Sequence, residues 1–430
     1  MAMAETTPSR GPHGKQGSPV SSRSGSPSRV SSKMKRHASA PQALETTLME
    51  SPSGVGSVIG SPLSDAAASL ASSGWLRLKQ NDLSGSMFLS TEALKQDSTL
   101  SPAWRCRAQA NLLSGNLEAA IRDLSGALKV DPGSSRDWQL RASAKLGVGD
   151  MQGALADSSQ SVALNSYKAD AWSTRSLARI QLHDFKAAEA DSTRAIDLDP
   201  RSAMYWGVRA NARINMGDTL GALADGSQAV KLASGSSAVW NHRADMRLRS
   251  SDHLGAMRDA TQAIRKNPRD LEGWCWRASA KISGGDFPGA VEDCSSAIKV
   301  DKACAWAWAI RGDARHRLGD WSGAIADFSE SLCHDASQAW VWIARGRTRF
   351  QKGLYSEAAE DFAAALEGDP ESEEAMHWLQ KAQSQVLVKK AWTLPLIQLG
   401  GSMPVTLQAL SKSSKGLERF DTKSSQSPSK

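Results

Sequence analysis

The stretch WRCRAQA, residues 104–110, recurs in altered form seven more times along the chain. The later copies read WQLRASA, WSTRSLA, WGVRANA, WNHRADM, WCWRASA, WAIRGDA and WIARGRT, so each Trp is followed three residues later by Arg and then by Gly, Ala or Ser. The eight Trp residues stand 34 positions apart without insertion or deletion, at 104, 138, 172, 206, 240, 274, 308 and 342. A fixed period of this length indicates a repeat array rather than two or three separate globular domains.

Other positions of the repeat keep the same period. Ala always stands sixteen residues after the Trp, and Ala or Ser stands twenty-three residues after it. Between these halves lies a turn such as Gly319-Asp320, whose Asp can cap a second helix. Four units close with a proline, at Pro132, Pro200, Pro268 and Pro370. Each unit is therefore predicted to be two antiparallel helices, and because one pair cannot bury its own apolar face, the pairs are expected to stack.

At this spacing, the Trp, the small residues, the Gly-Asp turn and the Pro resemble the tetratricopeptide repeat over residues 101–372. The resemblance implies an all-α fold, a right-handed α-solenoid of 34-residue helix–turn–helix repeats with eight clear copies. Residues 67–100 resemble a degenerate ninth copy, with Asp82 at the turn and Ala93 at the second small position. Residues 373–392 resemble the capping helix that shields the last repeat.

Two columns of opposite charge depart from the commonest form of that family. Arg three residues after the Trp and Asp nineteen residues after it occur in all eight copies, where the family usually has apolar or aromatic residues. Because a guanidinium and a carboxylate can pair through two hydrogen bonds, we predict an Arg–Asp ladder between first and second helices. A third column, seven residues after the Trp, is basic in seven copies and is Asn111 in the first, and it shares the face of the Arg.

These charged columns have two interpretations. They either pair inside the array or form a cationic stripe for an acidic peptide or RNA. The net charge of +7 belongs to the ends of the chain, since residues 1–63 carry seven Lys/Arg against three Asp/Glu and residues 391–430 carry five against two. The repeats between them are neutral, which favours internal pairing and makes nucleic acid an unfavoured partner.

Both ends of the chain have the composition of disordered tails. Residues 1–63 contain fourteen Ser and no Trp, Tyr or Phe, and residues 393–430 are Ser/Lys-rich. Such segments cannot bury enough apolar surface to offset the entropy of ordering. A Ser-rich, acid-poor N-terminus is also typical of an organellar transit peptide, and that alternative stays open.

The N-terminal tail carries candidate phosphorylation sites. Four serines that precede Pro resemble targets of proline-directed kinases: Ser18, Ser26, Ser51 and Ser61. Ser39, in RHASAP, resembles a basophilic kinase site whose phosphoserine a 14-3-3-type reader could bind. Phosphate there would add nearly two negative charges to a basic segment.

The sequence contains no signature of catalysis. It lacks H-E-x-x-H, G-x-S-x-G and G-x-x-x-x-G-K-[ST], and its five Cys include no C-x-x-C pair. No apolar run approaches the about 20 residues that a membrane-spanning helix needs. We therefore expect a non-enzymatic protein with no cofactor and reduced thiols, located in the cytoplasm, with a nuclear or organellar location as the alternative.

A protein–protein interaction scaffold is the function that the resemblance implies. The carboxylate clamp that such domains use for chaperone tails needs Asn two residues after the Trp position in one repeat and Arg there in the next. That column contains neither residue here. A co-chaperone without the clamp and a helical-repeat RNA binder are the two alternatives.

The resemblance also predicts where a partner would bind. In this family the first helices line a concave groove, through residues two before and one, two and five after the Trp. Toward the C-terminal end these positions become apolar or aromatic, beside a basic residue: Trp276, Trp306, Ile310, Trp340, Ile343 and Arg347. Exposed Trp near Arg is typical of an interface hot spot, but Trp306 and Trp340 could instead fill the seam between neighbouring first helices. The apolar stretch TLPLIQL, residues 393–399, could fold back into the same groove.

Overall fold

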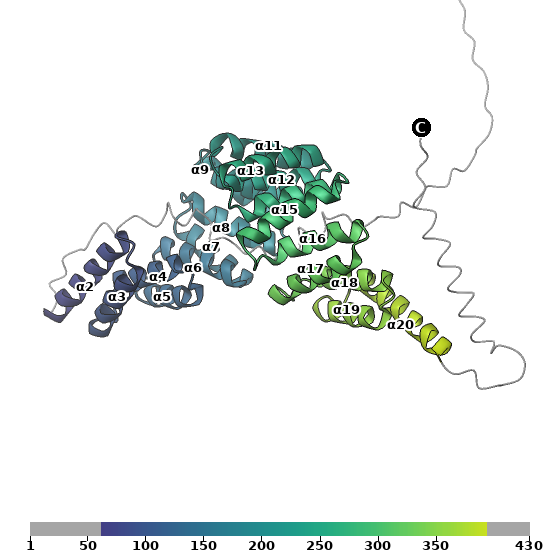
Figure 1. Ribbon diagram of the computed structural model, residues 1–430. Coiled ribbons are helices and arrows are strands. Elements are labelled where there is room, and N and C mark those ends of the chain that lie inside the picture. Colours follow the sequence, from purple (N-terminus) through teal and green to yellow (C-terminus); the bar gives the residue numbers. More distant parts are fainter. Residues whose placement is uncertain (1–61, 394–430) are drawn as a thin grey trace, which may run out of the picture.

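The computed structural model describes residues 62–393, and in that range the chain is all helix and turn (Figure 1). The first helices of the eight repeats are α4 (Ser101–Leu113), α6 (Ser135–Val148), α8 (Ala169–Gln181), α10 (Ala203–Met216), α12 (Ser237–Arg249), α14 (Leu271–Ser283), α16 (Ala305–Arg317) and α18 (Ala339–Gln351). The second helices are α5 (Leu117–Val130), α7 (Met151–Leu164), α9 (Phe185–Leu198), α11 (Thr219–Leu232), α13 (His253–Lys266), α15 (Phe287–Val300), α17 (Trp321–His334) and α19 (Tyr355–Gly368). The helices α2 (Pro62–Lys79) and α3 (Leu83–Gln96) precede this array, and α20 (Glu373–Thr393) follows it.

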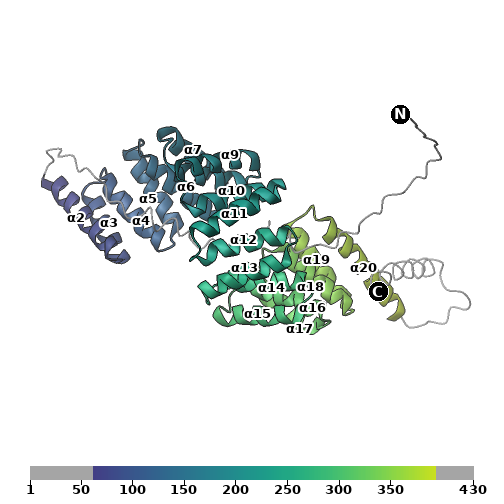
Figure 2. The ribbon, with the colours of Figure 1, turned by 90° about the horizontal axis from the view of Figure 1, so that it is seen from above.

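The helix pairs stack in chain order along a curved path (Figures 1 and 2). Each first helix packs against its own second helix, and each second helix packs against the first helix of the next repeat. First helices of neighbouring repeats also contact one another, as α12 does with α14 and α14 with α16. The first helices therefore lie on the inner side of the curve, and the predicted all-α solenoid is confirmed.

A side chain caps the second helix in seven of the eight pairs, whereas Leu354 stands at this position before α19 and provides no cap. In the second repeat, Gly149 has a φ of 89°, and the Asp150 side chain accepts a hydrogen bond from the backbone N–H of Gly153. Where the third residue of the second helix is Gly, this cap bond measures 2.8–2.9 Å. With Ala there, as at Ala119 and Ala187, it lengthens to 3.3 Å. The methyl group thus holds the capping oxygen away, which explains the Gly in most copies.

The two helices of a repeat approach most closely four residues after the Trp. This position holds only Gly, Ala or Ser, and it is Gly in the two repeats whose second helix carries a Phe opposite. Gly312 and Gly346 face the fully buried rings of Phe328 and Phe362, and a Cβ atom on either glycine would lie 2.8 Å from a ring carbon. In the last two repeats the missing Cβ of Gly therefore leaves the space that the Phe ring fills, which keeps the interior dense.

Both ends of the array are covered. At the C-terminal end, Trp378 of α20 stacks on Phe362, and Ala375 and Ala382 are fully buried against the last repeat. At the N-terminal end, Asp82 caps α3 and Ala93 is fully buried, so the α2–α3 pair repeats the turn and one small contact of the later copies. The end helices thus bury apolar surface that a terminal repeat would otherwise expose.

Candidate functional site

The charged columns of the repeat form an internal ladder. In every copy, the Arg three residues after the Trp donates from Nη2 to Oδ1 of the Asp at 2.7–2.8 Å, and from Nε to the same carboxylate at 2.7–3.2 Å. The carboxylates are only 1–4% exposed. These carboxylates are Asp123, Asp157, Asp191, Asp225, Asp259, Asp293, Asp327 and Asp361. The predicted Arg–Asp pairing of first and second helices is confirmed.

The second basic column binds the same carboxylates. Its Lys or Arg nitrogen lies 2.7–3.1 Å from the Asp in seven repeats, and Asn111 Nδ2 donates to Asp123 at 2.9 Å in the first. Each buried Asp therefore accepts from two donors on the first helix. Since both basic columns are engaged inside the array, neither is available as a cationic stripe for RNA.

Each ladder Arg is held by more than its Asp. Its guanidinium carbon lies 4.6–5.1 Å from the centroid of the Trp three residues before it, a cation–π arrangement. In six repeats, Nη1 also donates to a Ser or Thr hydroxyl on the second helix of the preceding copy, as Arg141 does to Ser125 at 3.0 Å. The indole N–H of the Trp donates to the backbone carbonyl six residues earlier at 2.8–3.0 Å. The Trp and Arg columns are therefore structural.

The groove columns predicted from the sequence are largely buried. The residues one and two after the Trp lie in the seam between neighbouring first helices, as the fully buried Cys106 and Cys275 show. Ile310 is 6% exposed and Ile343 9% exposed, and both belong to packed clusters of buried residues. Both side chains are therefore packed between adjacent first helices rather than open to the groove, although Trp276 in the second of these columns stays partly exposed. Ile310 and Ile343 therefore lie below the groove surface of the first helices rather than on it.

In the middle repeats the seam is polar and several of its groups bond to one another, whereas the buried Ser173 Oγ and Asn241 Oδ1 have no hydrogen-bond partner within the described residues. The hydroxyl of Tyr205 donates to Asp170 Oδ1 at 2.5 Å, and burial, with that carboxylate, raises the pKa of Tyr205 well above its ordinary value. His242 Nε2 lies 2.8 Å from the carbonyl of Gly207, and Asn241 donates to Asp270 at 2.8 Å. These groups join neighbouring first helices to each other or to the loop before the next one, rather than facing a ligand.

In the C-terminal repeats the seam is aromatic. Trp276 of α14 and Trp306 of α16 meet edge to face, with ring centroids 4.8 Å apart, and Trp340 of α18 packs on the next cluster of buried residues. All three rings are only partly buried. The indole N–H of Trp340 donates to Gln338 Oε1 at 3.1 Å. Those of Trp276 and Trp306 meet no acceptor within residues 62–393, and neither nitrogen is buried. We call Trp276, Trp306 and Trp340 the aromatic patch.

Charged and titratable side chains stand on the same first helices as the aromatic patch. Arg347 extends from α18 toward the capping helix, where its guanidinium lies 3.4 Å from Glu374 and 5.6 Å from the centroid of Trp378. His316 Nδ1 lies 2.9 Å from the hydroxyl of Thr348, and burial, assisted by the positive charge of Arg347, lowers the pKa of His316. The structure therefore brings Arg347 next to α20 rather than directly onto the Trp rings.

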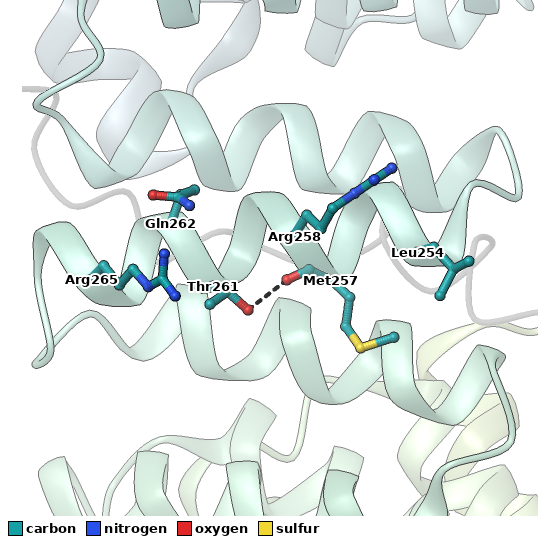
Figure 3. Close-up of a pocket in the computed structure, with 6 residues that line it drawn as sticks. All are labelled: Leu254, Met257, Arg258, Thr261, Gln262 and Arg265. Atoms are coloured by element: carbon teal, nitrogen blue, oxygen red, sulfur yellow. Dashed lines mark hydrogen bonds between the residues drawn. The ribbon is translucent and has the colours of Figure 1, made fainter.

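One surface hollow lies away from the groove, on α13 (Figure 3). Its lining residues are Leu254, Met257, Arg258, Thr261, Gln262 and Arg265. All six belong to one helix, so no opposing element closes over the hollow, and Thr261 uses its hydroxyl to bond Met257 O. This hollow lacks the enclosure of a small-molecule site.

Several predicted features lie outside the described residues. They are the candidate phosphoserines Ser18, Ser26, Ser39, Ser51 and Ser61 and residues 394–399 of the apolar stretch. Within residues 62–393, no three His, Cys, Asp or Glu side chains are grouped to hold a metal ion. No helix of that range is long and apolar enough to cross a membrane.

Comparison with known proteins agrees with this geometry. A sequence model described as tetratricopeptide repeat matches residues 277–339, whereas no curated protein matches the chain. The fold is similar to a chain of the APC/C hetero-tetramer Cut9–Hcn1, with a TM-score of 0.51 and 16% identity over 70% of this chain and 59% of that one. It is also similar to a tetratricopeptide repeat protein from Parabacteroides merdae ATCC 43184, with a TM-score of 0.51 and 16% identity over 58% of this chain and 99% of that one. The stacked helix pairs and the two structural matches show that the chain has the helical-repeat fold of tetratricopeptide repeat proteins, and the sequence model matches that repeat at residues 277–339.

Proposed function

We propose that the chain is a non-enzymatic scaffold that holds an extended segment of a partner protein against the aromatic patch. One observation carries the proposal: three Trp outside the structural Trp column lie partly exposed on the first helices of three consecutive repeats. Trp is costly to leave in water, and it is the residue most enriched among interface hot spots.

The chemistry of the aromatic patch favours a peptide as the ligand. The accessible indole N–H groups of Trp276 and Trp306 can donate to backbone carbonyls of an extended chain, while the ring faces cover apolar side chains. Arg347 and Asp313 stand on α18 and α16, and both already pair with neighbours, Glu374 and Arg317. We therefore expect recognition to depend mainly on apolar side chains and backbone of the partner.

Phosphorylation of the N-terminal tail is part of this proposal. The candidate sites are Ser18, Ser26, Ser39, Ser51 and Ser61, with kinases and a 14-3-3-type reader as the partners involved. Phosphates would reverse the positive charge of that tail. Mass spectrometry of the protein from its native source, before and after phosphatase, tests these sites directly.

A peptide-display selection tests the binding site. A random peptide library is selected on the purified full chain, and selected peptides are then measured against Trp306→Ala plus Trp340→Ala. The matched control is Trp321→Ala, which removes a partly exposed Trp from the start of a second helix. We expect the double variant to lose at least tenfold in affinity and the control to bind as the unmodified chain does. Undiminished binding by a folded double variant, judged by circular dichroism, would refute the assignment.

A further inference from the structure

The two most exposed leucines of the described range lie on the outer side of the solenoid. Leu220 of α11 and Leu254 of α13 are 83% and 71% exposed. Both stand fourteen residues after the Trp of their repeat, in consecutive copies. The other copies have Glu, Gln, Lys, Pro or Ser in this column. Two neighbouring aliphatic side chains left in water, where no other copy has one, mark a candidate contact surface.

The outer face of α13 has an apolar edge and a basic edge (Figure 3). Leu254 and Met257 lie along one edge, and Arg258 and Gln262 lie along the other. Arg265 follows Arg258 by two helical turns, about 10.5 Å along the axis. Neither Arg258 nor Arg265 forms an ion pair within residues 62–393. The face therefore offers two unpaired positive charges beside exposed apolar surface.

The same columns have the opposite character in α19, the second helix of the last repeat. Where α13 has Arg258 and Arg265, α19 has Glu360 and Glu367, and all four side chains are exposed. At the remaining columns of this face α19 has only small residues: Ser356, Ala359, Ala363 and Ala364. The two glutamates form no ion pair in the part of the chain that the structure describes, and residues 353–376 contain no Lys or Arg. The faces of α13 and α19 are therefore complementary in both charge and bulk.

We propose that the outer face of α13 binds the outer face of α19 of a second copy of this chain. Antiparallel packing brings the charged edges of the two faces together, since both faces carry their charges on the same side of the helix. It sets Arg258 opposite Glu367 of the second copy and Arg265 opposite Glu360, because the charges of each face are seven residues apart. The aliphatic side chains of α13 then lie over the small side chains of α19, which leave room for them.

The contact is heterologous, because the α13 face of one copy binds the α19 face of the next. The two outermost faces of such a pair stay free to bind further copies. Individual surface ion pairs are weak, so we expect reversible association that depends on protein concentration. Raising the salt concentration from about 0.1 M to about 1 M shortens the Debye length from about 10 Å to about 3 Å and should weaken the association. Both faces lie on second helices, so the contact does not depend on the proposed peptide binding by first helices.

Charge reversal tests the contact. Sedimentation velocity measures the mass of the full chain over a range of concentrations. The parent chain is compared with Arg258→Glu plus Arg265→Glu and with Glu360→Lys plus Glu367→Lys. We expect the parent chain to form oligomers and each double variant to be monomeric, since its α13 and α19 faces then carry the same charge. Mixing the two double variants should restore association, because each face again meets one of opposite charge.

A matched control reverses the same two columns of another second helix. Arg122 and Lys129 of α5 are exposed at these columns, but Glu118 stands where α13 has Leu254. Arg122→Glu plus Lys129→Glu should therefore associate as the parent chain does. Circular dichroism checks that every variant is folded.

A parent chain that is monomeric at all concentrations overturns the proposal. So does a mixture of the two double variants that stays monomeric, or a control variant that no longer associates. A monomeric parent chain that sediments with phosphatidylserine vesicles, and loses this binding on Arg258→Glu plus Arg265→Glu, would assign the α13 face to a membrane surface instead.

Discussion

Arg209 of α10 and Asp225 of α11 are joined by two parallel hydrogen bonds of 2.8 Å, from Nε to Oδ2 and from Nη2 to Oδ1. Asp225 is 2% exposed and accepts a further bond from Arg213. Asp225→Ala therefore leaves two partly buried guanidinium groups without their shared counter-charge, whereas Arg209→Ala leaves the carboxylate paired with Arg213. We expect Asp225→Ala to cost about 3–5 kcal/mol and Arg209→Ala about 1–3 kcal/mol.

The double variant measures the coupling. Removing Arg209 and Asp225 together should lower the free energy of unfolding in urea by less than the sum of the single changes, because neither leaves the other unpaired. Hydrogen exchange of the backbone amides of α10 and α11 would show whether the loss of stability lies in that helix pair. Simple additivity would mean that the two residues do not stabilise the repeat through their contact.

A second prediction concerns the close approach of α16 and α17. Gly312→Ala would place a Cβ atom 2.8 Å from the ring of Phe328, which is 1% exposed and cannot move into solvent. We expect a loss of about 1–3 kcal/mol from overpacking. Adding Phe328→Leu should restore part of it, since the first repeat already packs Ala108 and Leu124 in one cluster. An unchanged free energy of unfolding for Gly312→Ala would indicate that α16 and α17 can move apart without an energetic cost.

A third prediction concerns the turn residues. Ser251 has a φ of 63° at the position where most copies have Gly. A side chain in this left-handed region is strained by about 1–2 kcal/mol, so Ser251→Gly should raise the free energy of unfolding by about 0.5–1 kcal/mol after the added chain entropy of Gly. Gly217→Ser is the reverse control, with a φ of 87° and open space around the added Cβ. Equal stability of both variants and the parent chain would contradict the strain argument.

A fourth prediction is a pH profile for Cys304. Cys304 packs against the cluster that contains the buried Cys275, whose thiol lowers the pKa of Cys304 to about 7. The rate of alkylation by iodoacetamide should therefore rise through pH 7 and level off above it. Cys275→Ala removes that thiol, so the midpoint should move to higher pH. Quantitative mass spectrometry of the tryptic peptide 303–311 measures both rates. The same midpoint in both proteins would show that the neighbouring thiol does not activate Cys304.

Sequence reasoning found the features that recur and missed those that occur once. The Arg–Asp ladder was predictable because eight copies repeat the same two charges at a fixed spacing. The Ser or Thr hydroxyl that meets Nη1 recurs as well, and its column twenty-one residues after the Trp could have been recognised. The cluster that holds Cys275, Cys294 and Cys304 brings together unrelated repeat positions, so no period signals it.

The burial of Ile310 and Ile343 was missed for a different reason. The family pattern assigns their columns to the groove, but how far a column is exposed depends on the spacing of adjacent first helices. That spacing is set by many side chains together, and it is close enough here to cover most of the residues one and two after the Trp. Trp306 and Trp340, two residues before the Trp, keep part of their surface, and so does Trp276 in the second of the covered columns.

The bond that six of the eight ladder Arg residues make to the preceding repeat also makes the two ends of the array chemically different from its middle. Thr91 supplies the hydroxyl for Arg107 although its own helix pair lacks the ladder, with Ser73 and Leu89 at the two positions. At the other end the hydroxyl column becomes Ala363, and the following helix has Leu379 where the next Arg would stand. A duplicated repeat inserted in the interior would find complementary groups on both sides, whereas one appended beyond α19 would not. Growth or loss of this chain by whole units is therefore expected to occur internally, with the terminal segments kept as stops.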